Sequence, residues 1–441
     1  MAKYRDFDDD YEYDDDYEYE FNTRSNKVVH NEVKKEPVRT ATTHKAKKPR
    51  KKMKRWIMIL ICIVEVLIMT GLLGLVYIID KFDDIEIAPL DPEFIMDNQE
   101  EMDEDTKEVL KGYTNILLVG SDARDNSVEA LKDTLVNHSD TIIICSINND
   151  TKEIRLVSIY RDTILKMSKP DDPSDYKYTK ATESMFYYGA QSTLNMVNVN
   201  MDLNITDYVM VNWSALIDII DAVGGVDIEI TEEEREWLNA YLVDTSVNTG
   251  KKYTEVTNSG YVHLDGIQAT AYCRIRFTAG SDYRRTERQR TVLTEVFKKA
   301  KGMNLAQLNA AINAVVNNVS TTFTPEEIID MASDITKYSL TETTGFPFKL
   351  DDTGHIPYKD KRMEVVTPMD LNYNVTELHK FLFGVEGYTP TSTVQDISKT
   401  ISTVVSFEPI SQFLPQPPAE TQPQTEEATK VESETAETPA E

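Results

Sequence analysis

The chain has 441 residues, of which 75 are acidic and 47 basic, and its formal net charge is −28 at pH 7. This acidic balance argues against a general nucleic-acid-binding protein, which would show a basic domain or face. Three cysteines, Cys62, Cys145 and Cys273, form no disulfide framework. We expect Cys145 and Cys273 to pack as small core hydrophobes, with a buried disulfide between them as the alternative.

The N-terminal 55 residues change sign along their length. Residues 1–20 are acidic and rich in tyrosine, without helical or strand periodicity, which indicates disorder. Residues 45–55, KAKKPRKKMKR, are densely basic. The tyrosines could be phosphorylated, but a solvated charged segment is the favoured interpretation. The whole range 1–55 is therefore predicted to be a disordered cytoplasmic tail.

Residues 56–79, WIMILICIVEVLIMTGLLGLVYII, are predicted to form a transmembrane helix. The run is about long enough to cross a bilayer, and its one charged residue is Glu65. No small-residue cleavage site follows, which favours a retained anchor over a signal peptide. By the positive-inside rule, the basic block places the N-terminus in the cytoplasm and all later residues outside. Residues 80–110 are expected to form an acidic extracellular spacer.

From residue 111, short apolar runs alternate with helical patterns, which is typical of an α/β layered domain. Predicted strands cover residues 115–122, 141–148, 153–160, 207–213, 226–230 and 269–277. Predicted helices cover residues 181–201, 214–223, 231–242, 285–302 and 303–319. Gly224 and Gly225 are expected to end a helix in the left-handed conformation.

The domain assignment continues to the C-terminus. We assign residues 111–301 to the α/β layered domain and residues 302–390, which contain a further helical pattern, to the C-terminal part of the extracellular region. Residues 391–441 lead into a Pro/Glu/Thr-rich stretch and are predicted to be a disordered tail.

Six arginines gather between residues 272 and 290, in YCRIRFTAGSDYRRTERQR. Arg274 and Arg276 lie two apart on a predicted strand, so their side chains should point to the same side. On the following helix, at about 100° per residue, Arg285 and Gln289 continue the inward apolar face. The remaining arginines are expected outside that face, with Arg288 at the rim and Arg284 and Arg290 in solvent.

An inward arginine must meet an anion, because burying an unpaired charge carries a large desolvation cost. The N-terminus of a helix adds partial positive charge at the same end. Phosphate is the favoured anion, since the guanidinium group matches it bidentately. Structural ion pairs with Asp282 and other acids are the alternative, and composition alone does not decide between the two.

Acidic residues stand at the ends of the first predicted strands. Asp122 ends the first strand, Asp140 begins the second, and Arg161 with Asp162 follows the third. Strand ends are where open α/β sheets build ligand sites. Asp122 and Asp140 supply the hard oxygen ligands that suit Mg²⁺ with retained waters and phosphate oxygens. The sequence contains no zinc-type His/Cys cluster, no P-loop and no G-x-S-x-G motif.

In series, these motifs resemble the LytR-CpsA-Psr family over residues 112–301. The matching stretches are NILLVGSDAR, SDTIIICSINNDTKEIRLVSIYRDT, VNWSALIDIIDAVGGVDIEI, HLDGIQATAYCRIRF and DYRRTERQR. The resemblance implies an α/β/α sandwich with a mixed central sheet that shelters a polyprenyl tail. It also implies a membrane-anchored phosphotransferase of a Gram-positive envelope. Such an enzyme transfers teichoic acid or capsular polysaccharide from undecaprenyl pyrophosphate to peptidoglycan, assisted by Mg²⁺ or alternatively Mn²⁺.

The resemblance also implies roles for individual residues. Asp122 and Asp140 match the metal-associated acids. Arg161 matches a pyrophosphate contact, and Asp162 its structural partner or the catalytic base, for which Asp122 is the other candidate. The implied pyrophosphate-binding set is Arg124, Arg161, Lys180, Arg274, Arg276, Arg285 and Gln289.

Four places depart from the family pattern. His138 stands where the family usually has arginine, Tyr160 where it has proline and Arg284 where it has glycine, and TKATES around Lys180 differs from the K-I-N motif. The departures at His138 and Lys180 favour one alternative function, a non-catalytic scaffold that binds polyprenyl pyrophosphate. The other alternative, a membrane-bound transcriptional attenuator, is disfavoured because the predicted topology places the arginines outside the cell.

Overall fold

The structure is a computed structural model that describes residues 89–122, 138–278, 281–315, 319–359 and 361–407. The predicted tail 1–55 and transmembrane helix 56–79 lie outside these ranges, as do residues 408–441. Among the described residues, no helix combines the length and the apolar character needed to cross a membrane.

A mixed sheet of six strands forms the centre of the fold, in the order β10-β3-β2-β1-β6-β9. Its strands are β1 (Tyr113–Ser121), β2 (Ser139–Asn148), β3 (Glu153–Ile159), β6 (Asp207–Val211), β9 (Val319–Thr321) and β10 (Ser339–Phe346). The β1–β2, β2–β3 and β6–β9 pairs are antiparallel, and the β1–β6 and β3–β10 pairs are parallel. Ile144 of β2 lies between Leu117 and Val157, and all three are fully buried. The sequences of these strands are continuous apolar runs because both faces of the sheet are covered.

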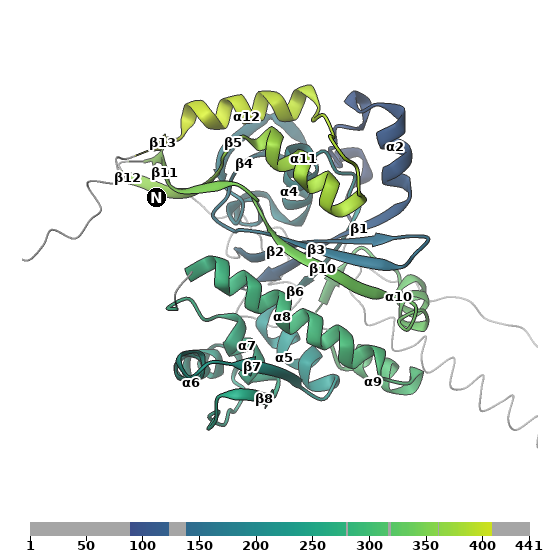
Figure 1. The fold of residues 1–441 in the computed structure, drawn as a ribbon, viewed down its shortest axis with the longest axis vertical. Coiled ribbons are helices and arrows are strands. Elements are labelled where there is room, and N and C mark those ends of the chain that lie inside the picture. Colours follow the sequence, from purple (N-terminus) through teal and green to yellow (C-terminus); the bar gives the residue numbers. More distant parts are fainter. Residues whose placement is uncertain (1–88, 123–137, 279–280, 316–318, 360, 408–441) are drawn as a thin grey trace, which may run out of the picture. The chain divides into compact units, whose positions relative to one another are not determined.

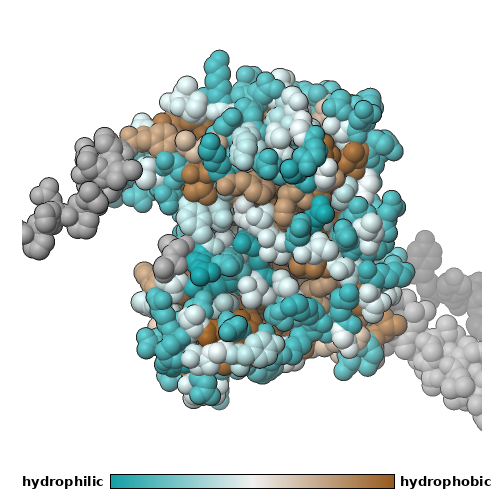
Figure 2. Space-filling model, in the orientation of Figure 1, coloured by the Kyte–Doolittle hydropathy of each residue, from teal (hydrophilic) through white to brown (hydrophobic). Residues whose placement is uncertain are grey.

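Helices cover both faces of the sheet (Figure 1). One face packs against α4 (Glu183–Met201), α11 (Leu371–Phe383) and α12 (Ser392–Val404). The other face carries α5 (Trp213–Ala222), α7 (Gly266–Cys273), α8 (Ser281–Lys301), α9 (Leu305–Val315) and α10 (Pro325–Ser333). The expected α/β/α sandwich with a mixed sheet is therefore confirmed. In Figure 2, hydrophilic residues prevail over the N-terminal half of α8, as expected for a helix whose apolar side packs inward.

Smaller elements surround this sandwich. Three small sheets are formed by β4 (Ile164–Lys169) with β5 (Asp172–Lys180), by β7 (Val226–Ile230) with β8 (Gly260–Leu264), and by β11 (Leu350–Tyr358), β12 (Lys361–Pro368) and β13 (Ser406–Phe407). Among the described residues, the remaining helices are η1 (Pro92–Phe94), η2 (Gln99–Glu101), α2 (Glu104–Lys111) and α6 (Glu232–Thr249). Gly224 and Gly225 adopt φ values of 84° and 78°, so the left-handed end predicted for the helix before them is confirmed.

The strand predicted over residues 269–277 is wrong. Residues up to Cys273 form α7, which begins at a capping box in which Asp265 and Gln268 exchange hydrogen bonds. Every residue of α7 is buried, so its sequence shows no amphipathic period and resembles a buried strand. Arg274 caps the C-terminus of this helix, and Arg276 lies in the loop that follows.

Three predicted boundaries also need correction. The sheet takes β9 and β10 from beyond residue 301, because β10 covers the edge of β3. Residues 392–404, predicted to be disordered, form α12, which buries Val394, Ile397 and Ile401 at helical spacing. The expected spacer contains η1, η2 and α2, and α2 packs against β1 through Leu110.

Asp202, fully buried at the end of α4, joins three distant segments. Its carboxylate accepts hydrogen bonds from Asn98 Nδ2 at 2.7 Å and from the Tyr388 hydroxyl at 3.0 Å. It also accepts bonds from the backbone N–H of Thr391 at 2.9 Å and from its hydroxyl at 2.7 Å. We call this set of contacts the Asp202 clasp. It explains why the segments on either side of the predicted domain fold onto it.

Candidate functional site

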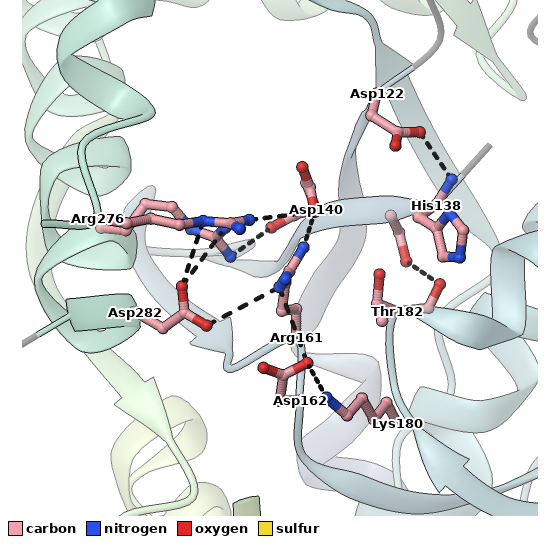
Figure 3. Close-up of polar contacts among 11 residues, drawn as sticks. Asp122, His138, Asp140, Arg161, Asp162, Lys180, Thr182, Arg276 and Asp282 are labelled. Atoms are coloured by element: carbon pink, nitrogen blue, oxygen red, sulfur yellow. Dashed lines mark hydrogen bonds and ion pairs between the residues drawn. The ribbon is translucent and has the colours of Figure 1, made fainter. Parts of the chain in front are cut away.

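The charged residues singled out in the sequence meet at one edge of the central sheet (Figure 3). Because β1, β2 and β3 are antiparallel neighbours, the end of β1, the start of β2 and the end of β3 lie together. These three positions carry Asp122, Asp140 and Arg161. The loop after α7 brings Arg276, and the first turn of α8 brings Asp282.

Three arginines share two carboxylates at the centre of the site. Arg161 donates a hydrogen bond to the carboxylate of Asp140, and Arg276 Nη2 lies 3.8 Å from the same group. Arg285 donates to the backbone oxygen of Asp140 at 3.4 Å. The carboxylate of Asp282 lies 3.5 Å from Arg285, 3.6 Å from Arg276 and 3.9 Å from Arg161. The expected ion pairs with Asp282 are therefore present.

These ion pairs leave donors of the arginines unused. The contacts with Asp282 are longer than hydrogen bonds, and the buried Nε atoms of Arg161 and Arg285 have no hydrogen-bond partner. Asp162 is a third carboxylate, 3.8 Å from Arg161, and it also pairs with Lys180. The unused arginine donors can accept a further anion, and the two interpretations of the arginines therefore coexist.

Arg285 is the most deeply placed of the three, with a side chain that is only 3% exposed. Burial lowers the pKa of Arg285 to about 10, although Asp282 opposes this shift. The guanidinium group thus stays charged at neutral pH, in a place where a bound anion would relieve its desolvation. The inward position predicted for Arg285 is confirmed.

The two acidic residues at the sheet edge differ in their surroundings. Burial alone would raise the pKa of Asp140, but the charges of Arg161 and Arg285 outweigh it and lower that pKa. For Asp122, burial and then the charge of Asp140 raise the pKa, although the backbone N–H of His138 donates to Asp122 at 2.8 Å. The carboxylates of Asp122 and Asp140 are thus close enough to repel each other.

The chemistry of this pair is compatible with the divalent cation predicted from the sequence. Asp122 and Asp140 offer hard oxygen ligands, and a cation between them would remove their repulsion. No group of three or more His, Cys, Asp or Glu side chains that could hold a metal occurs among the described residues. An ion here would have to complete its shell with water or phosphate oxygens.

Arg274 lies apart from the central cluster. It donates to the carboxylate of Asp244 and, at 2.6 Å, to the hydroxyl of Thr245, and its guanidinium lies 3.7 Å from the ring centre of Trp213. The prediction that Arg274 and Arg276 share one side of a strand is therefore wrong, because the helix end turns them apart. Both still line the same cavity.

Two other arginines on α8 differ from their predicted positions. Arg288 is buried and bonds Glu234 at 2.9 Å and the backbone oxygen of Ile275 at 3.1 Å, so it holds the loop that carries Arg276. Arg290, predicted to face solvent, is also buried, and burial lowers its pKa. The buried arc is wider than predicted because α8 contacts β7 and α7 as well as β3 and β10. Arg284 is exposed and pairs with Glu287, as expected.

The remaining predicted residues fall around the cluster. Lys180 pairs with Asp162 at 3.1 Å, and Asp162 lies 3.8 Å from Arg161. Gln289 lines the cavity beside Arg285, with its buried oxygen unbonded. Arg124 lies outside the described residues. Cys145 and Cys273 are buried free thiols, which confirms their packing role, and burial raises the pKa of each to about 12.

Three cavities adjoin this cluster in series. The arginine cavity, about 240 Å³, is lined by Arg274, Arg276, Arg285 and Gln289 together with Trp213 and Tyr241. The apolar cavity, about 210 Å³, lies between the sheet and helices α5 and α8. The outer cavity, about 430 Å³, contains Arg161, Asp162, Lys180, His138 and Glu183.

The cavities share walls. The arginine and apolar cavities have in common Gly120, Thr141, Val211, Leu216, Cys273 and Gln289. The arginine and outer cavities have in common Asp122, Asp140 and Arg276. The apolar and outer cavities share no residue.

The resemblance implied a shelter for a polyprenyl tail, but reasoning from the residues did not locate the apolar cavity or the aromatic wall at Trp213 and Tyr241. The signal for the cavity was the run of small residues in apolar segments, such as Gly120 and Cys273, which leaves space where larger side chains would fill the core. Trp213 could not be recognised in this way, because an aromatic residue at the start of a helix is also typical of an ordinary hydrophobic core.

Comparisons with known proteins give the family and the fold of the chain. The model of the LytR_cpsA_psr family matches residues 93–359. The teichoic acid transferase TagU of Enterococcus faecalis, named as acting between polyisoprenyl-teichoic acid and peptidoglycan, is 29% identical over 50% of this chain and 65% of its own length. Biofilm regulatory protein A of Streptococcus mutans is 28% identical over 47% of this chain and 49% of its own length. The chain thus spans about half to two thirds of these curated relatives.

One of two solved structures, with a TM-score of 0.50, supports the same fold. Protein gbs0355 from Streptococcus agalactiae has a TM-score of 0.50 at 22% identity, covering 66% of this chain and 95% of its own. The LytR-CPS2A-psr family protein YwtF (TagT) with bound octaprenyl pyrophosphate lipid has a TM-score of 0.43 at 22% identity, covering 63% and 92%. These likenesses concern the fold alone. Since the family model covers more than half of the chain, the protein belongs to the LytR-CpsA-Psr family.

Proposed function

We propose that the protein is a phosphotransferase that moves a glycopolymer from a polyprenyl-pyrophosphate carrier to peptidoglycan. The observation that carries this proposal is the continuity of the arginine cavity with an apolar cavity beneath the sheet. An amphiphile with an anionic head and a hydrocarbon tail fits that pair of cavities. The names of the relatives, transferases of teichoic acid to peptidoglycan, support the same reaction.

The two cavities divide the carrier between them. The apolar cavity is lined by Ile143, Val292 and Val296, among other aliphatic side chains, and would receive the start of the polyprenyl chain. The pyrophosphate would lie against Arg276 and Arg285, whose charges the two nearby aspartates only partly neutralise. Burying hydrocarbon gives affinity, at about 0.8 kcal/mol for each buried CH₂, whereas the arginines give orientation.

The transfer step then consists of positioning and charge stabilisation. Arg161, Arg276 and Arg285 would stabilise negative charge on the transferred phosphoryl group and on the departing lipid phosphate. Asp122 and Asp140 would hold Mg²⁺, which supplies positive charge beside the phosphate oxygens when bound.

The contacts of Asp162 and Asp122 indicate different roles for the two residues. Asp162 is tied to Lys180 and Arg161, so we assign it to hold those cations in place. Asp122 forms no ion pair with a described residue and lines both the arginine and the outer cavity. Asp122 is therefore the carboxylate that we place at the reacting groups.

The proposal includes an anchor at residues 56–79 and a catalytic domain outside a Gram-positive cell. The charge asymmetry around that segment is what supports this placement. Protease treatment of intact cells tests it, because residues 408–441 should be cleaved from outside. Protection of those residues on intact cells, with cleavage after lysis, would overturn the topology.

Binding of a polyprenyl pyrophosphate to the full chain in detergent tests the function. Saturable binding is expected for the wild type and should be weakened at least about tenfold in Arg161→Ala and Arg285→Ala, because a charge-assisted contact contributes roughly 1.5–3 kcal/mol. Arg284→Ala is the matched control, since it removes an exposed arginine from the same helix turn. Folding of each variant is checked by thermal unfolding.

The outcomes separate the candidate functions. Absence of binding by the folded wild type would overturn the proposal and leave the arginines as structural ion pairs. Binding without transfer of a lipid-linked glycan to peptidoglycan would instead favour the scaffold.

A further inference from the structure

The order of the three cavities determines how a substrate would be oriented in the site. The arginine cavity lies between the other two, because it shares lining residues with both the apolar cavity and the outer cavity. The apolar and outer cavities share no lining residue. If the polyprenyl chain lies in the apolar cavity, the bond to the departing lipid phosphate points toward that end. The transferred phosphorus then lies near Asp140 and Arg276, where the arginine and outer cavities meet.

In phosphoryl transfer, the attacking and leaving oxygens lie roughly in line. The acceptor hydroxyl must therefore approach from the side opposite the apolar cavity. Its oxygen forms a bond to the transferred phosphorus, while the bond from phosphorus to the bridging oxygen breaks. The bridging oxygen leaves with its electron pair on the lipid monophosphate, and the hydroxyl proton passes to Asp122 or to water. The donor glycan, a substituent on the same phosphorus, must project sideways.

We propose that the outer cavity is the acceptor subsite and that a surface beside it, the acceptor ledge, binds the glycan strand of peptidoglycan. The acceptor ledge consists of Lys177, Phe186, Tyr187, Tyr188 and Tyr358. This inference rests on the proposed function, because the assignment of the lipid to the apolar cavity sets the direction of attack.

The acceptor ledge is continuous with the outer cavity. His138, which lines the cavity, stacks on Phe186 with ring centres 4.8 Å apart, and Phe186 contacts Tyr187 edge-on at 5.2 Å. The Nζ atom of Lys177 lies 3.8 Å from the ring centre of Tyr187. A hydrogen bond with Tyr358 raises the pKa of Tyr187 to about 12. Elements β5, α4 and β11 thus contribute to one surface.

The chemistry of the acceptor ledge suits a sugar polymer. Tyrosine presents an apolar ring with a polar tip, which matches the apolar faces and peripheral hydroxyls of a pyranose. Tyr187 and Tyr188 pack against the core but are only half-buried, and Tyr358 is 36% exposed, so each of these residues keeps part of its surface open to solvent. Lys177 adds a donor, and Glu183 adds an acceptor at the mouth of the cavity.

Strand β5 offers an internal control. Side chains alternate across a strand, so Tyr176 faces the other way from Lys177. Tyr176 is 52% exposed and lies under Lys166 rather than beside Tyr187. Tyr176→Ala therefore removes an exposed tyrosine from the same hairpin without touching the acceptor ledge.

The test measures binding of uncrosslinked peptidoglycan glycan strands to the full chain in detergent, together with binding of polyprenyl pyrophosphate. Lys177→Ala and Tyr358→Ala should each weaken glycan binding by about tenfold, the scale of one hydrogen bond to a charged group or of one aromatic contact. Tyr176→Ala should bind glycan as the wild type does. All three variants should bind polyprenyl pyrophosphate normally. Where transfer is measurable, the KM for the acceptor should rise while the KM for the donor stays the same.

Each outcome decides between proposals. Loss of glycan binding with normal lipid binding supports the acceptor ledge. Glycan binding that is unaffected, or equally weakened in Tyr176→Ala, overturns it. A raised KM for the donor alone assigns the surface to the donor glycan instead. Failure of the wild type to bind polyprenyl pyrophosphate is a failure of the proposed function, and is separate from these results.

Discussion

At the residue scale, the site is a balance between arginines and the acids that hold them. Asp140 and Asp282 keep Arg161, Arg276 and Arg285 in place, yet leave buried donors unused. Such partial satisfaction is unfavourable in an ordinary core, where buried polar groups are nearly always bonded. Here it keeps the site ready for a phosphate group.

Asp122→Asn should remove the effect of Mg²⁺ on the affinity for polyprenyl pyrophosphate. The wild type should bind more tightly with Mg²⁺ than without it, because the ion offsets the repulsion between Asp122, Asp140 and the phosphates. The measurement is the dissociation constant with and without Mg²⁺, so no turnover is needed.

Asp282→Asn is the matched control for this comparison. It removes a carboxylate that contacts Arg276 and Arg285 and should tighten anion binding while keeping the Mg²⁺ effect. An Mg²⁺ effect that persists in Asp122→Asn would show that the ion does not use this pair.

At the scale of elements, the sequence predicted the central strands well and the arginine-bearing segment poorly. The stretches that form β1, β2 and β3 are continuously apolar because these strands are buried on both faces, and this pattern is easy to recognise. The same kind of signal misled the assignment of α7, which is buried all round. The β4–β5 hairpin was missed because β5, DPSDYKYTK, is polar and mostly exposed.

The candidate site shows the same limits. Residues named at strand ends, such as Asp140 and Arg161, were predicted to lie together, and they do, because sheet pairing brings strand ends together. The direction of Arg274 could not be predicted, since it depends on α6 supplying Asp244. The burial of Arg290 likewise depends on which elements pack against α8.

Asp265→Ala should weaken both stability and ligand binding, because α7 positions Arg274 and Arg276. Loss of an N-cap costs about 1 kcal/mol, which urea unfolding measures. Thr324→Ala removes the equivalent capping box of α10, which lines none of the three cavities, and should cost about the same stability. Binding of polyprenyl pyrophosphate should fall in Asp265→Ala and change less in Thr324→Ala. Equal effects of the two variants on binding would contradict a positioning role for the α7 cap.

At the scale of the whole molecule, the C-terminal helices are part of the folded unit. His379 of α11 is fully buried, stacks on Tyr388 with ring centres 3.7 Å apart, and donates a hydrogen bond to the backbone oxygen of Met201 at 3.0 Å. It thus couples α11 to the end of α4, next to the Asp202 clasp.

His379 should make the protein less stable in acid. Burial lowers its pKa from 6.5 to about 4, so between these pH values the unfolded chain binds more protons than the folded one. Stability from this group is fully present above pH 6.5 and is lost as the pH falls toward 4, by up to about 1.4 kcal/mol per pH unit. Urea unfolding of the wild type and of His379→Gln at pH 7 and pH 5 measures the difference. A pH dependence that is the same in both proteins would contradict this account.

The Asp202 clasp has a consequence for modularity. It brings Asn98, before the first strand of the sheet, beside Thr391, at the start of α12. A fragment that ends before Tyr388 would leave the buried carboxylate of Asp202 without three of its hydrogen bonds, which is costly for a buried charge. The sandwich is therefore not divisible near residue 390, and it can be transplanted only as a unit that keeps residues 98 and 391 together.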